Sequence, residues 1–214
     1  MNKAALYGFV AISLSLLVTG IQAAHPGPYV GMGVGVSRLD TTSPYGGYDE
    51  ATHNQGGLGG RVFLGYHPSR HFGLEMGYAR YARSRYQVDL DVLSSSIRYE
   101  MKAVDWVGKG YMPLFDSSWN LYVLGGIAYV EDKVTFHPGD VPLASGVTPP
   151  PNGSTTYRHV RPLYGVGVEY DVPNSPITTS MEFSRIQGTG NRLMQPSAVP
   201  FANMLTVNLA YTLG

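Results

Sequence analysis

The sequence contains no cysteine in its 214 residues. A secreted fold held together by disulfides is therefore excluded, and no cysteine follows the N-terminal segment to carry a lipoprotein anchor. Positive and negative side chains balance to a formal net charge of zero, so the composition gives no support for a nucleic-acid partner. After the N-terminal segment, no stretch approaches the ~18–20 apolar residues that a membrane-spanning helix requires.

What the sequence does contain begins with an export signal. Lys3 supplies a positive charge, and the apolar run of residues 4–18 is followed by small residues. This pattern predicts a signal peptide over residues 1–23 and one domain over residues 24–214. The alternative is an N-terminal anchor helix that is not cleaved.

Strict alternation of apolar and polar residues ends the sequence and recurs along it. In the last segment Leu205, Val207 and Leu209 point to one side. Thr206 and Asn208 point to the other, which is the period of a β-strand with one apolar and one polar face. The 27 glycines and 16 tyrosines also fit a barrel, because small residues leave room in a narrow lumen and aromatics form interfacial girdles.

Segments of strand character are separated by connections that are alternately short and long. The strand segments are 28–39, 57–66, 71–82, 100–112, 119–131, 159–171, 177–187 and 203–214. The short connections are 67–70, 113–118 and 172–176, and the long ones are 40–56, 83–99, 132–158 and 188–202. We therefore predict an all-β fold: an eight-stranded antiparallel up-and-down transmembrane β-barrel with short periplasmic turns and four long extracellular loops. A soluble β-sandwich is the alternative, but it would not require this alternation.

Short motifs in a fixed order carry a resemblance to a known family. They are GLEMGYARY at 73–81, KGYMP at 109–113, YGVGVEYDV at 164–172 and LTVNLAYTLG at 205–214. In this order and spacing they resemble the membrane domain of OmpA and related small eight-stranded outer-membrane proteins. The resemblance implies a location in the outer membrane of a Gram-negative bacterium. Many OmpA proteins carry a periplasmic peptidoglycan-binding domain after the barrel, and we expect this protein to lack it.

Charged residues fall on the polar face of the expected strands. If Glu75 points inward, its neighbours Leu74 and Met76 face lipid, and the same rule applies to every strand. An arginine or lysine on the lipid face near the midplane would cost about 2–4 kcal/mol, which fixes the register. The expected lumen residues are Arg61, Glu75, Asp105, Lys109, Glu169 and Glu182.

Those lumen charges need partners, because unpaired buried ions are costly. The resemblance implies a plug of acid–base pairs that maps onto Glu75, Lys109 and Glu169. The family also has an arginine on its seventh strand, where this sequence has Ser180, and Arg61 is the expected substitute. We interpret the charges as a structural plug; a switchable gate is the alternative.

Basic residues gather in loops and at strand ends on the expected outer side. They are Arg80, Arg83, Arg85, Arg98, Lys102, Arg158 and Arg161. Some of them could pair with lipopolysaccharide phosphates, and the alternative is ordinary solvated loop charge.

Candidate chemistry is sparse. A lipid-modifying enzyme would need a histidine beside a serine or carboxylate near the outer leaflet. His67 and Ser69 instead lie in an expected periplasmic turn, and His159 has no neighbouring serine. We expect no catalytic residue, metal or cofactor.

The sequence thus predicts a monomeric scaffold that serves either envelope integrity or surface contact with a host, a phage or neighbouring cells through its loops. Its barrel would contact outer-membrane lipids and lipopolysaccharide. The alternatives are a narrow pore for ions or small solutes and, less favoured, an outer-membrane lipid-modifying enzyme.

Overall fold

The structure is a computed structural model that describes residues 27–40, 52–54, 56–90, 93–114, 118–137, 153–189 and 199–213. The expected signal peptide over residues 1–23 lies outside the described residues, as does most of the expected third long loop. Within the described ranges, no helix has the length and apolar character needed to cross a membrane.

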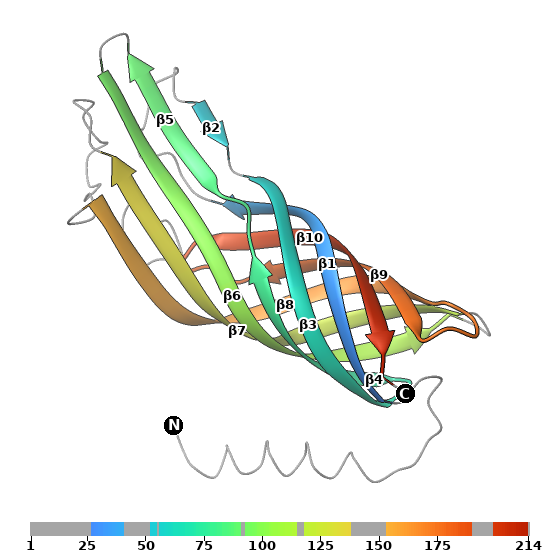
Figure 1. Ribbon diagram of the computed structural model, residues 1–214. Helices are drawn as coiled ribbons and strands as arrows, with labels where there is room; N and C mark the ends of the chain where they lie inside the picture. Colours follow the sequence, from blue (N-terminus) through green and yellow to red (C-terminus); the bar gives the residue numbers. More distant parts are fainter. Residues whose placement is uncertain are drawn as a thin grey trace, which may run out of the picture.

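All regular structure in the described residues is antiparallel β-sheet. The strands are β1 Gly27–Asp40, β2 Thr52–Asn54, β3 Gly56–Ser69, β4 Phe72–Arg80, β5 Ser84–Leu90, β6 Leu93–Pro113, β7 Trp119–His137, β8 Ser154–Asp171, β9 Ile177–Ile186 and β10 Phe201–Thr212. Their order is β2-β5-β6-β4-β3-β1-β10-β9-β8-β7, and an additional β6–β7 pairing closes a ring of eight strands. The expected eight-stranded antiparallel barrel is confirmed, with two short additional strands: β5 pairs with the outer part of β6, and β2 pairs with β5 (Figure 1).

The strand register fixes the shape of the barrel. A path that starts at Lys102 on β6 and follows paired residues through β4, β3, β1, β10, β9, β8 and β7 returns to β6 at Met112. The path therefore gains ten residues in one circuit. Such a stagger requires the strands to tilt against the barrel axis, and a ring of eight encloses only enough space for side chains to fill.

Side chains alternate between the lumen and the outer surface as the sequence pattern predicts. On β10, Val207 is 61% exposed, whereas Thr206 beside it is 1% exposed. On β7 the exposed side chains run from Trp119 to Tyr129 and are followed by Glu131. That run matches the ~9–11 residues with which a tilted strand crosses the hydrocarbon layer.

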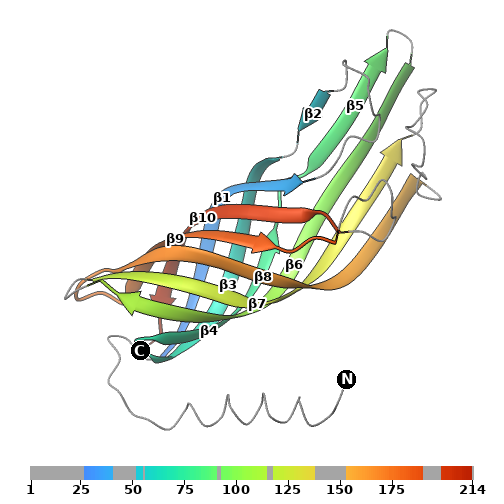
Figure 2. The same ribbon diagram turned by 180° about the vertical axis from the view of Figure 1, so that it is seen from behind.

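The wall of the barrel is much taller on one side than on the other. The outer parts of β6, β7 and β8, together with β5, rise beyond the ring (Figure 1). Seen from behind, β9 and β10 end well short of them (Figure 2).

The tall wall corrects several expected strand limits. Residues 84–90 and 93–99 were expected in a loop but form β5 and the outer part of β6. Residues 132–137 and 154–158 likewise extend β7 and β8. The expected limits stopped near the length that spans lipid. Pairing does not stop there, because antiparallel strands remain hydrogen-bonded to each other in water.

Candidate functional site in the barrel lumen

Charged side chains from four strands meet near the middle of the lumen. Arg61 on β3, Glu75 on β4, Asp105 and Lys109 on β6 and Glu182 on β9 are all at most 7% exposed. The two residues beside each of them on its strand are more exposed than it is, so the alternation of the strand carries the charged side chain inward.

Arg61 is the centre of this charge cluster. Its Nη2 donates to Glu75 Oε1 at 2.6 Å, and its Nη1 donates to Glu182 Oε1 at 2.6 Å. Nη2 also lies 3.3 Å from Asp105 Oδ1. One guanidinium thus joins three carboxylates, which its planar fork of donors suits well.

Lys109 supplies the second positive charge. Its Nζ lies 2.7 Å from Glu75 Oε2 and 3.2 Å from Glu182 Oε2. Tyr29 donates to the same Glu75 oxygen at 3.2 Å, and Tyr122 donates to Glu182 Oε2 at 3.0 Å. Glu75 and Glu182 therefore each receive an arginine, a lysine and a tyrosine donor, which offsets much of the cost of burying them.

Glu169 stands apart from this cluster. Its side chain is 8% exposed on β8, yet no ion pair or hydrogen bond of its carboxylate is found in the described part of the chain. Ser180, at the position where the resemblance has an arginine, accepts a hydrogen bond from Asn208 at 3.1 Å. The arginine that pairs with Glu182 is instead Arg61 on β3.

Aromatic rings fill the lumen on the periplasmic side of the cluster. His67 stacks on Tyr29 with ring centroids 4.5 Å apart and contacts the Tyr111 hydroxyl at 3.2 Å. Phe63 lies under both cations, with its centroid 5.0 Å from Arg61 Cζ and 5.6 Å from Lys109 Nζ. His67 was expected in a turn, but β3 continues to Ser69 and carries it into the lumen.

Sequence reasoning missed these aromatic partners, although a signal for them existed. Phe63 shares the strand face of Arg61, and Tyr111 shares that of Lys109. Each ring is two residues from an inward-facing charge, so the alternation of the strand places it in the lumen as well.

Apolar side chains fill the lumen on the outer side of the cluster. The buried members there include Leu39, Tyr81, Met101, Leu163, Ile186 and Met204. The cavity between this layer and the cluster has a volume of about 10 Å³. It has room for about one water molecule.

Of the seven basic residues singled out above, Arg80 ends β4 and Arg83 follows it. The other five lie within strands rather than in loops: Arg85 on β5, Arg98 and Lys102 on β6, and Arg158 and Arg161 on β8. Arg83 pairs with Glu100 at 2.9 Å and Arg158 pairs with Glu131 at 3.1 Å, while Arg161 donates to Thr189 at 3.3 Å. Arg80 and Arg85 are exposed, and Arg98 and Lys102 are half-buried.

The described residues offer no arrangement of metal ligands. Within those ranges, no group of three or more histidine, aspartate or glutamate side chains could hold a metal ion. His71 is exposed at the periplasmic turn, and His67 faces tyrosines.

A closed ring with an apolar exterior and a filled, charged interior defines an integral outer-membrane β-barrel. Residues 24–214 match the OmpA-like transmembrane domain, and the chain belongs to this family. It is a protein of the Gram-negative outer membrane.

Solved structures of small outer-membrane barrels share the fold. The attachment invasion locus protein Ail of Yersinia pestis is 13% identical, with a TM-score of 0.50 over 88% of this chain and 99% of that one. Neisserial surface protein A is 11% identical, with a TM-score of 0.54 over 87% and 97%. OprG from Pseudomonas aeruginosa is 13% identical, with a TM-score of 0.50 over 91% and 100%. No curated protein matches the sequence.

Proposed function

We propose that the protein is a closed, non-catalytic and monomeric scaffold of the outer membrane that presents loops at the cell surface. The observation that carries this proposal is the filled lumen. Aromatic, charged and apolar layers follow one another along the barrel axis, and the cavity above the charge cluster measures about 10 Å³. A passage for hydrated ions would need a continuous polar path, which these layers interrupt.

The charge cluster serves as the structural plug of this scaffold. It ties β1, β3, β4, β6, β7 and β9 together through side-chain contacts across the lumen. Two glutamates with three donors each hold their positions without solvent, so the plug closes the lumen without any need for a lid.

Release of small solutes from vesicles tests whether the barrel is closed. The full chain is reconstituted in vesicles that contain a fluorescent ion indicator or, in a separate sample, a small sugar. Ion entry and sugar release should both be no faster than in protein-free vesicles. Release that scales with the amount of folded protein would establish the narrow pore instead.

Surface presentation is tested with an epitope tag on intact cells. The first tag is inserted between residues 138 and 152, after β7 and before β8. The second tag is inserted at 173–175, in the short turn before β9. Antibody should label intact cells that carry the first tag and not those that carry the second. The reverse pattern would invert the orientation and remove the basis for a role in contact with a host, a phage or other cells.

A further inference from the structure

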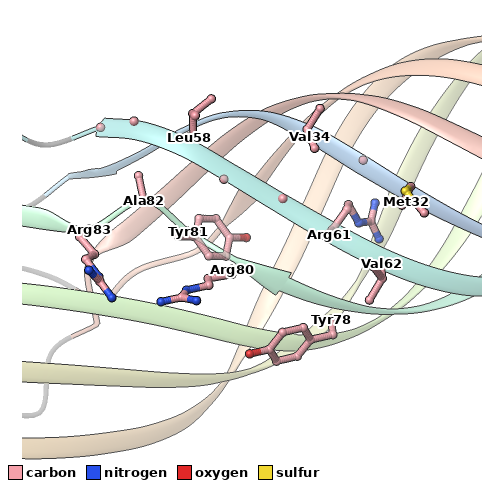
Figure 3. Close-up of a pocket in the computed structure, with 15 residues that line it drawn as sticks. Met32, Val34, Leu58, Arg61, Val62, Tyr78, Arg80, Tyr81, Ala82 and Arg83 are labelled. Carbon is pink, nitrogen blue, oxygen red and sulfur yellow. The ribbon is translucent and has the colours of Figure 1, made fainter.

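A groove interrupts the lipid-facing surface beside the outer part of β3. It has a volume of about 720 Å³. Its apolar walls come from Met32, Val34, Leu58, Val62 and Tyr78, and Arg80 and Arg83 lie at one end (Figure 3). Leu58 is 85% exposed, the highest value among the exposed large apolar residues described.

The groove exists because two strands separate there. Pairing between β3 and β4 ends at Gly60 and Arg80, so the expected strand 71–82 stops early. The chain then turns toward the lumen, where the Ala82 N–H donates to the buried Ser37 hydroxyl at 2.7 Å. A Cβ at Gly59 would lie 2.8 Å from that hydroxyl, so the glycines of this stretch permit the close approach and leave the groove unfilled.

Two cations lie side by side at the edge of this groove, and neither forms an ion pair within the described ranges. Arg80 on β4 and Lys102 on β6 are directly opposite each other in the register and share the outward face. Like charges in this arrangement repel. Glu131, which is opposite Lys102 on β7, pairs with Arg158. No carboxylate of the described ranges lies within 4.0 Å of Arg80 or Lys102.

These cations mark the outer boundary of the apolar band. Two residues closer to the periplasm, the pair that faces the outer surface is Tyr78 and Val104, whose side chains are 44% and 45% exposed. An aromatic residue followed by basic residues is the arrangement expected at the level of lipid headgroups. Arg80 also lines the groove, so the positive site and the apolar site are continuous.

We propose that this groove binds the lipid A part of lipopolysaccharide. A phosphate lies between Arg80 and Lys102, where charge-assisted hydrogen bonds satisfy both cations. An acyl chain lies along Met32, Val34 and Leu58. The site narrows the seven basic residues to two without an acidic partner in the described ranges: Arg80, which lines the groove, and Lys102, which is opposite it. It depends on the outer-membrane location and not on whether the lumen is closed.

Native mass spectrometry of the detergent-solubilised full chain tests the site, with purified bisphosphorylated lipid A as the probe. Wild type should retain one lipid A per chain. The Arg80→Ala/Lys102→Ala variant should bind it at least tenfold more weakly. The matched control is Arg70→Ala, which removes an exposed cation from the periplasmic turn and should bind as wild type does. A mobility shift between heated and unheated samples verifies that each variant is folded.

Two further binding measurements test which groups of lipid A the site recognises. Lipid A without its phosphates should bind wild type as weakly as intact lipid A binds the double variant. Phosphatidylglycerol should displace lipid A only at a large excess, because its acyl chains and phosphate are fewer. Equal retention by wild type and the double variant would overturn the proposal. So would equal binding of dephosphorylated lipid A, or displacement at an equal concentration of phosphatidylglycerol.

Discussion

Replacing Arg61 with methionine is expected to be the most damaging single removal of charge from the lumen. The substitution keeps an unbranched side chain but removes ion pairs at 2.6, 2.6 and 3.3 Å. Glu75 and Glu182 each retain Lys109 and a tyrosine, whereas Asp105 loses its ion-pair partner. Breaking a buried pair costs about 3–5 kcal/mol, and we expect a loss in that range.

Lys109→Met should cost less than Arg61→Met. Both of the glutamates that Lys109 contacts keep Arg61, so the loss resembles that of hydrogen bonds to charged groups, about 1.5–3 kcal/mol. Arg70→Met, at an exposed turn residue, is the control and should change stability by about 0.5 kcal/mol or less.

Reversible urea unfolding in lipid vesicles measures these losses, with tryptophan fluorescence and unheated gel mobility as independent probes. A double-mutant cycle between Arg61→Met and Glu182→Gln should give a coupling of about 0.5–3 kcal/mol. A loss below about 1 kcal/mol for Arg61→Met, together with additive effects in the cycle, would refute the view that Arg61 organises the cluster.

Two further predictions test the boundary of the lipid band and the packing of the lumen. Val166→Arg on β8 places a charge on a side chain 55% exposed to lipid and should cost about 2–4 kcal/mol. The control is Thr156→Arg, which lies on the same face of β8 but farther out than Arg158 and should cost about 0.5 kcal/mol or less. Equal losses of stability in urea unfolding would show that the lipid band does not lie where these exposed residues place it. Gly33→Val directs a side chain against Asn208 and should cost about 1–3 kcal/mol. A Cβ at Gly125, on the outward face of β7, meets nothing within 4 Å, so Gly125→Val is the control. Equal stability of the two glycine variants would count against a tightly packed lumen.

Alternation of residue types was sufficient to predict the ring. Val207 and Thr206 fall on opposite faces because the strand period leaves no other choice once one face meets lipid. The same rule placed Arg61 and Lys109 on the inner face. The tall wall was not predictable in this way, because residues 93–99 lie outside the lipid and are held by their pairing with β5 and β7.

The partners within the lumen depend on register, which a single strand does not reveal. Arg61 meets Glu182 although 121 residues separate them, because the ten-residue stagger of the ring brings β3 and β9 to the same level. Arg80 and Lys102 were both singled out among the basic residues. Only the register shows that they are opposite each other, and only the early end of β4 reveals the groove beside them.

Single-channel recording in planar lipid bilayers tests the closed lumen most directly. Wild type should show no steady conductance. The Arg61→Met/Lys109→Met variant leaves Glu75, Asp105 and Glu182 without lysine or arginine partners and should pass a cation-selective current. A steady wild-type current equal to that of the variant would contradict the plug.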